Sequence, residues 1–406
     1  MTTEDTETYL RAAGVGVLVT TPGGSLPQIR YWGADLGDLG TDALADVDVA
    51  AAPVPVDGGP DRIPELGVLP EHAAGWNGRP GLTGHRQGTG WSPRFALRAL
   101  DVTAGSRGSG GRIVATGADD AAGLGVRVEL ELLASGLLRQ RARVEVPAGG
   151  AGGYVVDGLT LALPVPPVAT ELLDLAGRWG RERAPQRAPF LVGTHTRESR
   201  RGRTGPDAPL VLAAGTPGFG FRSGEIWAVH VAWSGNHRSH AERTSEGVAL
   251  LGGGELLLPG EVRLGAGDHY TSPWIYAAYG VGLDAIAHRF HEQVRAGRTS
   301  RPQPVVLNTW EATYYRHDPE RLLELARRGA EVGAERYVLD DGWFGNRRDE
   351  TSGLGDWFVD EERWPGGLAP LVSAIRELGM DFGLWVEPEM VNPDSDLARA
   401  HPDWIM

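Results

Sequence analysis

The sequence predicts a multidomain protein in which an all-β region precedes a region of alternating strands and helices. Two observations carry this prediction. Up to about Thr271, short runs of alternating apolar and polar residues are separated by clusters of Gly, Pro, Asp and Ser, a pattern typical of antiparallel β-sandwiches. From Pro304 onward, apolar strands alternate with helical segments, which indicates parallel β-α-β units in either a barrel or a doubly wound sheet.

The strands of the first region are recognised by their period of two. The clearest runs are VRVELELL at 126–133, ARVEVP at 142–147 and IWAVHVAW at 226–233. Alternation of this kind places one set of side chains in a core and the other set at the surface. A stretch rich in Pro, Ala and Gly at 50–60 is interpreted as a loop within this region and not as a domain boundary.

The periodicity changes to that of helices after Thr271. Residues 282–298 place apolar side chains on one side of a helix, which we interpret as a linker helix. Further on, the segments PVVLN, RYVLD and FGLWVE are predicted strands, separated by helices at 319–332 and 368–378. Asp318 is expected to cap the first of these helices, with Pro319 in its first turn and Gly333 at its end.

Composition excludes several classes of function. The chain of 406 residues has a formal net charge of −14, which argues against a nucleic-acid partner. It contains no cysteine and no lysine, so disulfides, thiolate zinc sites, phosphate-binding lysines and Schiff-base lysines are excluded. The early residues Glu4, Asp5 and Glu7 do not resemble an export signal, and no apolar run is long enough to span a membrane. We therefore expect a cytoplasmic protein without a membrane partner.

Polar and aromatic residues follow all three strands of the second region. They are Asn308, Trp310 and Glu311 after the first strand, Asp340, Asp341 and Trp343 after the second, and Trp385, Glu387 and Glu389 after the third. In a parallel barrel the carboxyl ends of the strands form the active-site face. Carboxylates accept hydrogen bonds from sugar hydroxyls and indoles stack on sugar rings, so the pattern predicts a sugar site. The alternative is that these acids cap helices or face solvent.

Other chemistries fit the sequence less well. Asp340 and Asp341 could bind a metal ion with help from Asp349, Asp356 and Asp360, but the interleaved aromatic residues favour a sugar, so neither metal nor cofactor is expected. His288 and His291 do not have the spacing of a zinc helix. His195 and the arginines of 197–203 could bind a phosphate, but a solvated loop is the preferred interpretation.

A family resemblance rests on ordered motifs. NTWEATYY (308–315), VLDDGWFG (338–345), LGDWFVD (354–360), GLWVEPEMV (383–391) and HPDW (401–404) resemble signatures of glycoside hydrolase family 36, the family of bacterial α-galactosidases. Upstream, RYWG (30–33), GRWGRER (177–183), WSGN (233–236) and residues 259–272 are similar to its N-terminal domain. The resemblance implies a β-supersandwich over 1–280, a linker helix over 281–303 and the first three units of a (β/α)8 barrel, incomplete, over 304–406.

The implied activity is retaining hydrolysis of terminal, non-reducing α-D-galactosyl residues in sugars such as melibiose and raffinose. An α-N-acetylgalactosaminidase or a galactosyl-transferring relative are alternatives within the enzyme class. An inactive galactoside-binding module is the alternative from another class. The family enzymes are often homotetramers, so a homotetramer is also implied for the full-length enzyme.

The resemblance assigns roles residue by residue. Asp340 and Asp341 would accept bonds from galactose hydroxyls, and Trp310 and Trp385 would wall the pocket. Three further residues, Trp343, Glu387 and Glu389, are weaker candidates because they could be structural. The two catalytic aspartates of the family would lie beyond Met406, so no catalytic residue is expected within this chain.

One upstream motif departs from the family pattern. Where family members carry Asp-Phe-Arg, this sequence reads Gly84, His85 and Arg86. Arg86 matches and becomes a further candidate for substrate binding, but the aspartate is missing.

Overall fold

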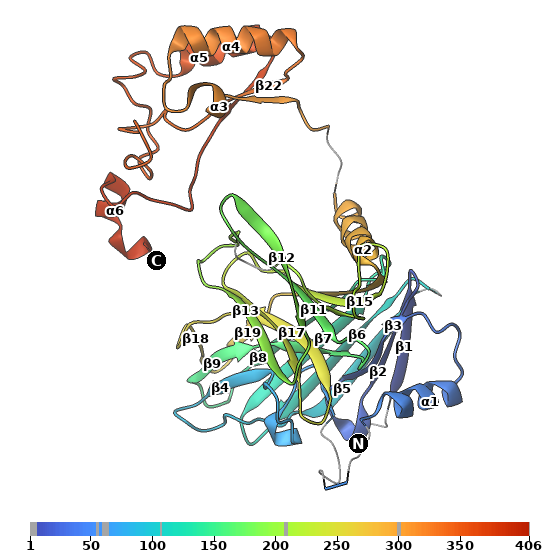
Figure 1. Ribbon diagram of the computed structural model, residues 1–406. Helices are drawn as coiled ribbons and strands as arrows, with labels where there is room; N and C mark the ends of the chain where they lie inside the picture. Colours follow the sequence, from blue (N-terminus) through green and yellow to red (C-terminus); the bar gives the residue numbers. More distant parts are fainter. Residues whose placement is uncertain are drawn as a thin grey trace. The chain divides into compact units, whose positions relative to one another are not determined.

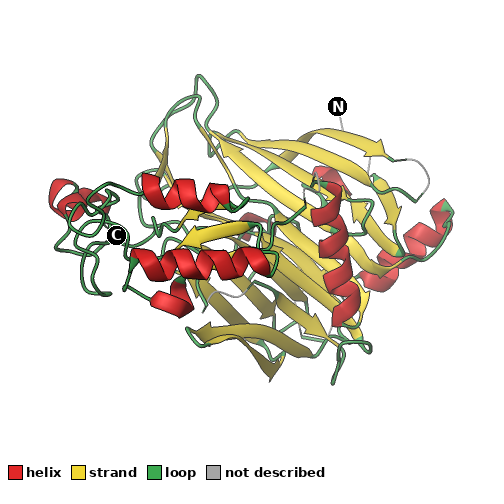
Figure 2. Cartoon of the chain, turned by 90° about the horizontal axis from the view of Figure 1, so that it is seen from above, coloured by secondary structure: helices red, strands yellow, loops and turns green. Residues whose placement is uncertain are grey.

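The chain folds into two compact units, Met1–Arg298 and Thr299–Met406 (Figure 1). The structure, a computed structural model, describes residues 6–53, 57–58, 65–105, 108–206, 210–298 and 302–405. Strands make up most of the first unit, while the second combines helices with short strands (Figure 2). The predicted change from β to mixed structure is therefore confirmed.

All strand pairs of the first unit are antiparallel. The largest sheet has the order β12-β11-β14-β15-β20-β8-β7-β6-β5, with β19 paired to β8. Its strands are β5 (Ala96–Ala104), β6 (Gly111–Asp119), β7 (Leu124–Leu132), β8 (Leu138–Glu145), β11 (Glu171–Arg178), β12 (Arg181–Pro189), β14 (Leu212–Gly215), β15 (Glu225–Val231), β19 (His269–Thr271) and β20 (Ile275–Val281).

Three smaller sheets complete the first unit. They are β1-β2-β3, β10-β17-β16-β13 and β18-β9-β4. Their strands are β1 (Glu7–Ala12), β2 (Val15–Thr20), β3 (Gln28–Ala34), β4 (Leu82–His85), β9 (Tyr154–Leu159), β10 (Leu161–Val165), β13 (Gly193–Ser199), β16 (His237–Arg243), β17 (Ala249–Glu255) and β18 (Val262–Leu264). One apolar core draws side chains from all four sheets.

Strand β8 shows how the sequence pattern produces this packing. Its residues alternate between buried and partly exposed along the whole strand, and Ala142 and Val144 are fully buried. On the opposite face, the guanidinium carbons of Arg139 and Arg141 each lie 4.3 Å from the centre of the Trp274 ring. The apolar side chains supply the core, and the guanidinium groups of the two arginines lie over the Trp274 ring in cation–π contacts.

The prediction of a purely β first region is wrong at one place, because residues 41–51 form a helix. This helix, α1 (Thr41–Ala51), buries none of its residues, so it leaves no apolar stripe by which a helical period could be recognised. Ala50 and Ala51 end the helix, whereas the sequence interpretation assigned them to a loop. Of that loop, residues 52–53 and 57–58 are non-helical, and 54–56 and 59–60 lie outside the described residues. Short 3-10 turns occur at Pro22–Gly24 and His72–Ala74.

Strand β17 contains three successive glycines that leave no room for side chains. A Cβ at Gly253 would lie 2.7 Å from the Arg238 carbonyl oxygen and 2.7 Å from Val231 Cγ2. We expect Gly253→Ala to lower the free energy of unfolding by about 1–3 kcal/mol, because overpacking a close-packed region forces its neighbours apart. Urea denaturation should show this loss. Gly149→Ala is the control, since its Cβ would meet nothing within 4 Å, and equal midpoints for the two variants would contradict the prediction.

A helix occupies the position predicted for the linker. It is α2 (Leu283–Ala296), in which Ile286 is buried. Ile286 belongs to a small apolar cluster with Ile226 and Ala278 of strands β15 and β20, and Leu283 and Phe290 pack against this cluster. The helix therefore lies on the largest sheet of the first unit.

The second unit contains a parallel sheet of three strands in the order β21-β22-β23. As predicted, helices separate the strands. The elements are β21 (Val306–Asn308), α3 (Trp310–Thr313), α4 (Pro319–Glu331), β22 (Arg336–Leu339), α5 (Ala369–Glu377), β23 (Asp381–Leu384), α6 (Asp396–Ala400) and a 3-10 turn at Pro402–Trp404. The predicted cap of α4 is confirmed, because Asp318 Oδ1 accepts a hydrogen bond of 2.9 Å from the backbone N–H of Arg321.

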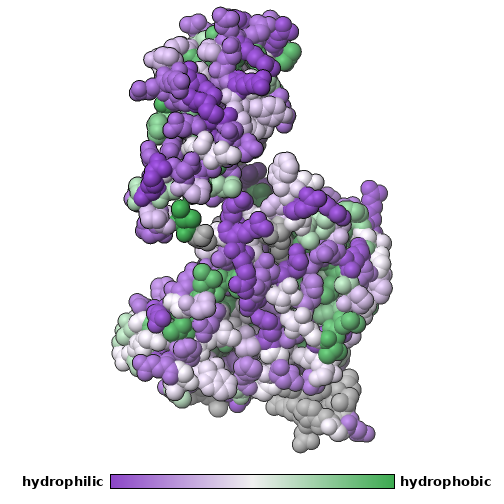
Figure 3. Space-filling view, turned by 60° about the vertical axis from the view of Figure 1, so that its left-hand side comes forward, coloured by the Kyte–Doolittle hydropathy of each residue, from purple (hydrophilic) through white to green (hydrophobic). Residues whose placement is uncertain are grey.

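Helices α4 and α5 lie side by side (Figure 1) and share a core with the sheet. Leu322 of α4, Ile375 of α5, and Tyr337 and Leu339 of β22 are fully buried. The central strand is thus covered, whereas apolar side chains on and beyond the outer strands are exposed, as Val306 (50%) and Val386 (52%) show. No helix in the described part of the chain is long and apolar enough to cross a membrane. The face shown in Figure 3 is mainly hydrophilic, with apolar residues in small groups.

Candidate functional site

The candidate site begins where the three parallel strands end. The backbone N–H of Thr309, after β21, donates to the Val338 carbonyl at 3.1 Å, and the N–H of Trp385, after β23, donates to the Leu339 carbonyl at 3.0 Å. These bonds continue the sheet by one residue on each side of β22. The residues that follow the three strands are therefore brought to one edge, as predicted from parallel pairing.

The Asp340 carboxylate is held in place by groups from two strands. Asn308 Nδ2 donates to Asp340 Oδ2 at 2.5 Å, and the backbone N–H of Asp341 donates to Asp340 Oδ1 at 2.7 Å. The N–H of Asp340 itself donates to Thr309 Oγ1 at 3.0 Å. Each carboxylate oxygen has one internal donor, which leaves capacity on both oxygens for further hydrogen bonds. Asp340 is thus a fixed acceptor suited to hydroxyl groups.

Asp341 is engaged differently, through a buried ion pair. Arg347 Nε donates to Asp341 Oδ1 at 2.9 Å and Arg347 Nη2 donates to Oδ2 at 2.8 Å. Both side chains are nearly inaccessible, at 4% and 6% exposure. Burial alone would lower the pKa of Arg347, but the hydrogen bonds and charge of Asp341 outweigh burial and raise that pKa above its ordinary value. Sequence reasoning did not find Arg347, which lies in the loop after β22.

Trp310 stands at the start of α3 between two tyrosines. Its ring meets those of Tyr314 and Tyr315 edge to face, with centroids 5.1 and 5.2 Å apart. Tyr314 has a backbone φ of 46°, which is a strained conformation for a tyrosine, and its hydroxyl donates to Glu311 at 2.9 Å. Trp310 is only partly buried, so part of its indole surface is accessible for stacking.

Trp385 belongs to a second aromatic group. Its ring is stacked with Phe344 at a centroid distance of 6.4 Å and meets Trp357 edge to face at 6.2 Å. Trp385 is partly buried. Trp343, in contrast, is only 4% exposed and lies in the core of the unit, where its indole N–H donates to the Trp385 carbonyl at 2.9 Å. Trp343 therefore holds the backbone of Trp385 through this hydrogen bond, and almost none of its own surface is exposed to solvent.

The remaining acids of the region have separate environments. Glu387 is partly buried and Glu389 is exposed. Asp349 accepts from Thr351, Asp356 accepts from the backbone N–H groups of Asp396 and Leu397 at the start of α6, and Asp360 pairs with Arg348. Across the described ranges, no group of three or more potential metal ligands is found.

The structure gives specific partners for two residues of the first unit that the sequence analysis singled out, Arg86 and His195. Arg86 donates to the carbonyls of Ala122 at 2.8 Å and Gly152 at 3.3 Å, so its guanidinium is bonded to backbone of its own unit. His195 was assigned to a solvated loop, which is wrong. It lies in β13, with Nε2 2.6 Å from the buried Asp174 Oδ2, a partner 21 residues away that the local sequence does not indicate.

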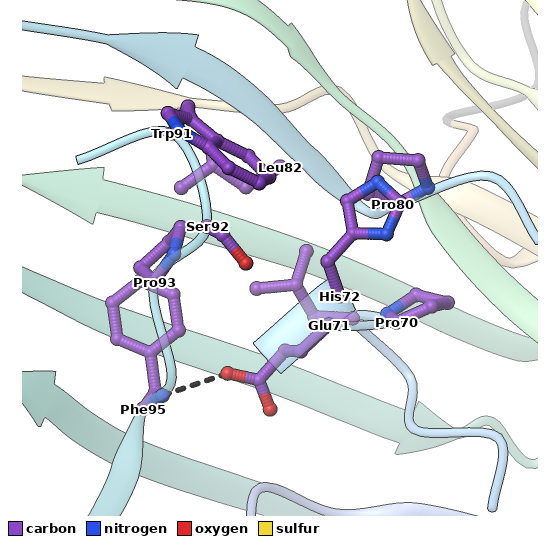
Figure 4. A pocket seen from close by; sticks show the side chains of 10 residues that line it. Pro70, Glu71, His72, Pro80, Leu82, Trp91, Ser92, Pro93 and Phe95 are labelled. Carbon is purple, nitrogen blue, oxygen red and sulfur yellow. Dashed lines mark hydrogen bonds between the residues drawn. The ribbon is translucent and has the colours of Figure 1, made fainter. Parts of the chain in front are cut away.

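A small pocket in the first unit also escaped sequence reasoning. Figure 4 shows its lining, which includes Glu71, His72, Leu82 and Trp91. Glu71 Oε1 accepts from the backbone N–H of Phe95 at 2.7 Å, and burial raises the pKa of Glu71 to about 7. The Trp91 ring is 61% exposed. The pocket is therefore lined by apolar side chains and by the Glu71 carboxyl group.

His317, close to the site, is a buried histidine with a lowered pKa. Its ring is buried and lies 6.0 Å from that of Trp364. Burial, assisted by the charge of Arg363, lowers the pKa of His317 from 6.5 to about 4. The folded state therefore keeps this histidine neutral, and the associated stability is complete above pH 6.5 and is lost as the pH falls toward 4.

We expect the free energy of unfolding to fall by up to about 2 kcal/mol from this group between pH 7 and pH 5. Denaturant unfolding at the two pH values measures the loss. His317→Gln should show a smaller decrease than the wild type over the same interval, because glutamine does not titrate. An identical pH dependence in the two proteins would show that His317 is not the titrating group.

Comparison with known families gives two matching sequence models. The sequence model for the N-terminal domain of glycosyl hydrolase family 36 matches residues 25–265, which is more than half of the chain. The chain belongs to glycosyl hydrolase family 36. A second model, for melibiase, matches residues 269–406 and so includes all three parallel strands and the Asp340–Asp341 pair.

Relatives within family 36 are longer than this chain. An α-galactosidase from Escherichia coli is 38% identical over 384 residues, which cover 93% of this chain and 52% of the relative. The α-galactosidase AgaA from Geobacillus stearothermophilus is 35% identical over 264 residues, or 64% of this chain and 36% of the relative. The chain thus spans about half the length of the E. coli relative.

Solved family 36 structures share the fold. A structure of a variant of G. stearothermophilus AgaA in complex with 1-deoxygalactonojirimycin matches 98% of this chain and 59% of that chain, with a TM-score of 0.86 and 26% identity. AgaB from the same organism matches 99% of this chain and 59% of that chain, with a TM-score of 0.84 and 27% identity.

Proposed function

We propose that this family 36 chain takes part in the retaining hydrolysis of terminal, non-reducing α-D-galactosyl residues, in sugars of the melibiose and raffinose type. The observation that carries the proposal is the rigidly held Asp340–Asp341 pair at the carboxyl end of β22, with Trp310 and Trp385 following the two flanking strands. The names of its relatives support the same activity, since one AgaA structure is a complex with raffinose.

The domain organisation that we propose is the one implied by membership of family 36. Residues 1–280 would form the β-supersandwich, 281–303 the linker helix, and 304–406 the first three units of a (β/α)8 barrel. The sequential parallel order β21-β22-β23 supports this assignment, because a barrel adds each new strand beside the previous one. The exposed Val306 and Val386 at the outer strands also support it, since strands of a closed barrel have neighbours on both sides.

Within the site, we assign recognition to the aspartates and stacking to the tryptophans. Asp340 would accept hydrogen bonds from galactose hydroxyls through the free capacity of both oxygens, and Asp341 would do so through the lone pairs that Arg347 leaves unused. Trp310 and Trp385 would present indole faces to the sugar. Trp343 would support Trp385 from the core. Glu387 and Glu389 remain candidates at the rim.

We assign cleavage of the glycosidic bond to residues other than Asp340 and Asp341. Retaining hydrolysis needs two carboxyl groups about 5–5.5 Å apart on opposite sides of the scissile bond. Asp340 and Asp341 are neighbours in sequence and each is tied to nearby donors, an arrangement that fits hydrogen-bond acceptance. We therefore propose that the nucleophile and the acid/base residue are supplied by later barrel strands. The same observation favours the alternative function, a galactoside-binding module without activity.

Calorimetric titration of the purified chain tests this proposal. We expect 1-deoxygalactonojirimycin and galactose to bind, and glucose, which differs from galactose only at C4, to bind at least about tenfold more weakly. Equal binding of galactose and glucose would contradict the proposed recognition. Hydrolysis of p-nitrophenyl α-D-galactoside by the chain alone would contradict the assignment of the catalytic pair to other residues.

A further inference from the structure

Arg347 is a buried cation with an unusually complete set of partners. The residue is 3% exposed, and two of its nitrogens bind both oxygens of Asp341. The third, Nη1, donates to the Ser352 carbonyl at 2.8 Å. The guanidinium carbon lies 5.3 Å from the centre of the Tyr315 ring and 5.8 Å from that of Phe344. The group is thus fixed in its plane as well as in its position.

Asn392 connects the Arg347 guanidinium to the segment that follows β23 through hydrogen bonds. Asn392 Oδ1 accepts from Arg347 Nη1 at 3.4 Å and from the Leu354 N–H at 2.8 Å. The backbone N–H of Asn392 donates to the Leu354 carbonyl at 3.0 Å. A single amide side chain therefore links the loop after β22, which carries Arg347, to the loop after β23.

We propose that Arg347, anchored by Asn392, is a positioning residue that sets the orientation of the Asp341 carboxylate for galactoside recognition. This inference rests on the proposed function of the site. A carboxylate free to rotate about its last bond would present its oxygens in many directions. The bidentate guanidinium fixes that rotation, and the carboxylate, which also contacts the Tyr315 side chain, keeps acceptor capacity for sugar hydroxyls. Arg347 itself touches no substrate in this arrangement.

A lysine at position 347 would keep the positive charge but lose the pair of hydrogen bonds that the guanidinium donates to the two oxygens of Asp341. An ammonium group is a point charge on a flexible stem and cannot hold both carboxylate oxygens in one plane. Arg347→Lys therefore separates the two roles of the residue. If the residue only neutralises a buried charge, lysine preserves binding, whereas if it orients Asp341, lysine weakens binding even in protein that remains folded.

The test compares three variants by titration with 1-deoxygalactonojirimycin, together with thermal unfolding. Arg347→Lys is expected to raise Kd at least about tenfold at a temperature where it is folded, and Asn392→Ala by a smaller factor of about three. Arg336→Lys is the matched control, since the Arg336–Asp381 pair lies at the surface of the same unit, and it should bind like the wild type.

The outcomes are distinguishable. A wild-type Kd in Arg347→Lys would overturn the inference and leave the proposed function intact, whatever the change in thermal stability. If Arg347→Lys does not fold, Asn392→Ala decides, because it leaves the ion pair in place, and unchanged binding in that variant would overturn the inference. A wild-type chain that binds no galactoside overturns the proposed function, and the inference with it.

Discussion

Replacing Asp340 by alanine is expected to weaken the binding of 1-deoxygalactonojirimycin by about 100-fold. The side chain is buried, and both of its oxygens are oriented by Asn308 and by the Asp341 N–H. Its removal deletes a charged acceptor and leaves the sugar hydroxyls that it would bind without this partner. The loss of one hydrogen bond to a charged group costs about 1.5–3 kcal/mol of binding free energy. Calorimetric titration of the two proteins measures the change.

Asp349→Ala provides the control for this substitution. Asp349 lies in the same unit and is exposed, and its carboxylate accepts hydrogen bonds from Thr351, so its loss should leave binding unchanged. Equal affinities for the wild type and Asp340→Ala would show that Asp340 is not part of the recognition site. A comparable loss in both variants would point to a general effect on the fold.

Replacing Asp341 by alanine is expected to produce the largest loss of stability, about 3–5 kcal/mol. The substitution leaves the Arg347 guanidinium buried without its carboxylate, and an uncompensated buried charge is far more costly than the pair is favourable. Urea denaturation followed by tryptophan fluorescence measures the effect. The double variant Asp341→Ala/Arg347→Met should recover much of the stability, because it removes both charges together.

The surface pair Arg336–Asp381 gives the matched comparison. Its partners are 42% and 68% exposed and lie 2.9 Å apart, so Asp381→Ala should cost less than about 1 kcal/mol. If Asp341→Ala costs no more than Asp381→Ala, the Asp341–Arg347 pair does not contribute as its burial indicates. A double variant that is no more stable than Asp341→Ala would also contradict this explanation.

The meeting of the three strand ends could be predicted, because parallel pairing brings successive strand ends to one edge. Nothing more than the alternation of strands and helices was needed to place Asn308, Asp340 and Trp385 together. The cap at Asp318 was equally local, since the acceptor and the N–H that it binds are three residues apart. Both features depend only on the alternation of strands and helices or on residues close in sequence, and this is why they can be predicted from the sequence.

Features that depend on distant partners could not be predicted. Arg347 is one of several loop arginines, and the sequence does not indicate which carboxylate each will meet in space. Trp343 and Trp385 occupy similar positions after their strands, yet packing buries the first and leaves the second partly accessible. The pairing of His195 with Asp174 joins residues on different sheets. Each of these outcomes is decided by tertiary packing.

A crystal structure of this chain with 1-deoxygalactonojirimycin would test the central claim most directly. The account predicts that hydroxyl oxygens of the ligand lie within about 2.5–3.0 Å of the Asp340 carboxylate, with the ligand ring against Trp310 or Trp385 and the Asp341–Arg347 pair intact. A ligand bound elsewhere, with no hydroxyl in contact with Asp340 or Asp341, would contradict the assignment of galactoside recognition to the end of β22.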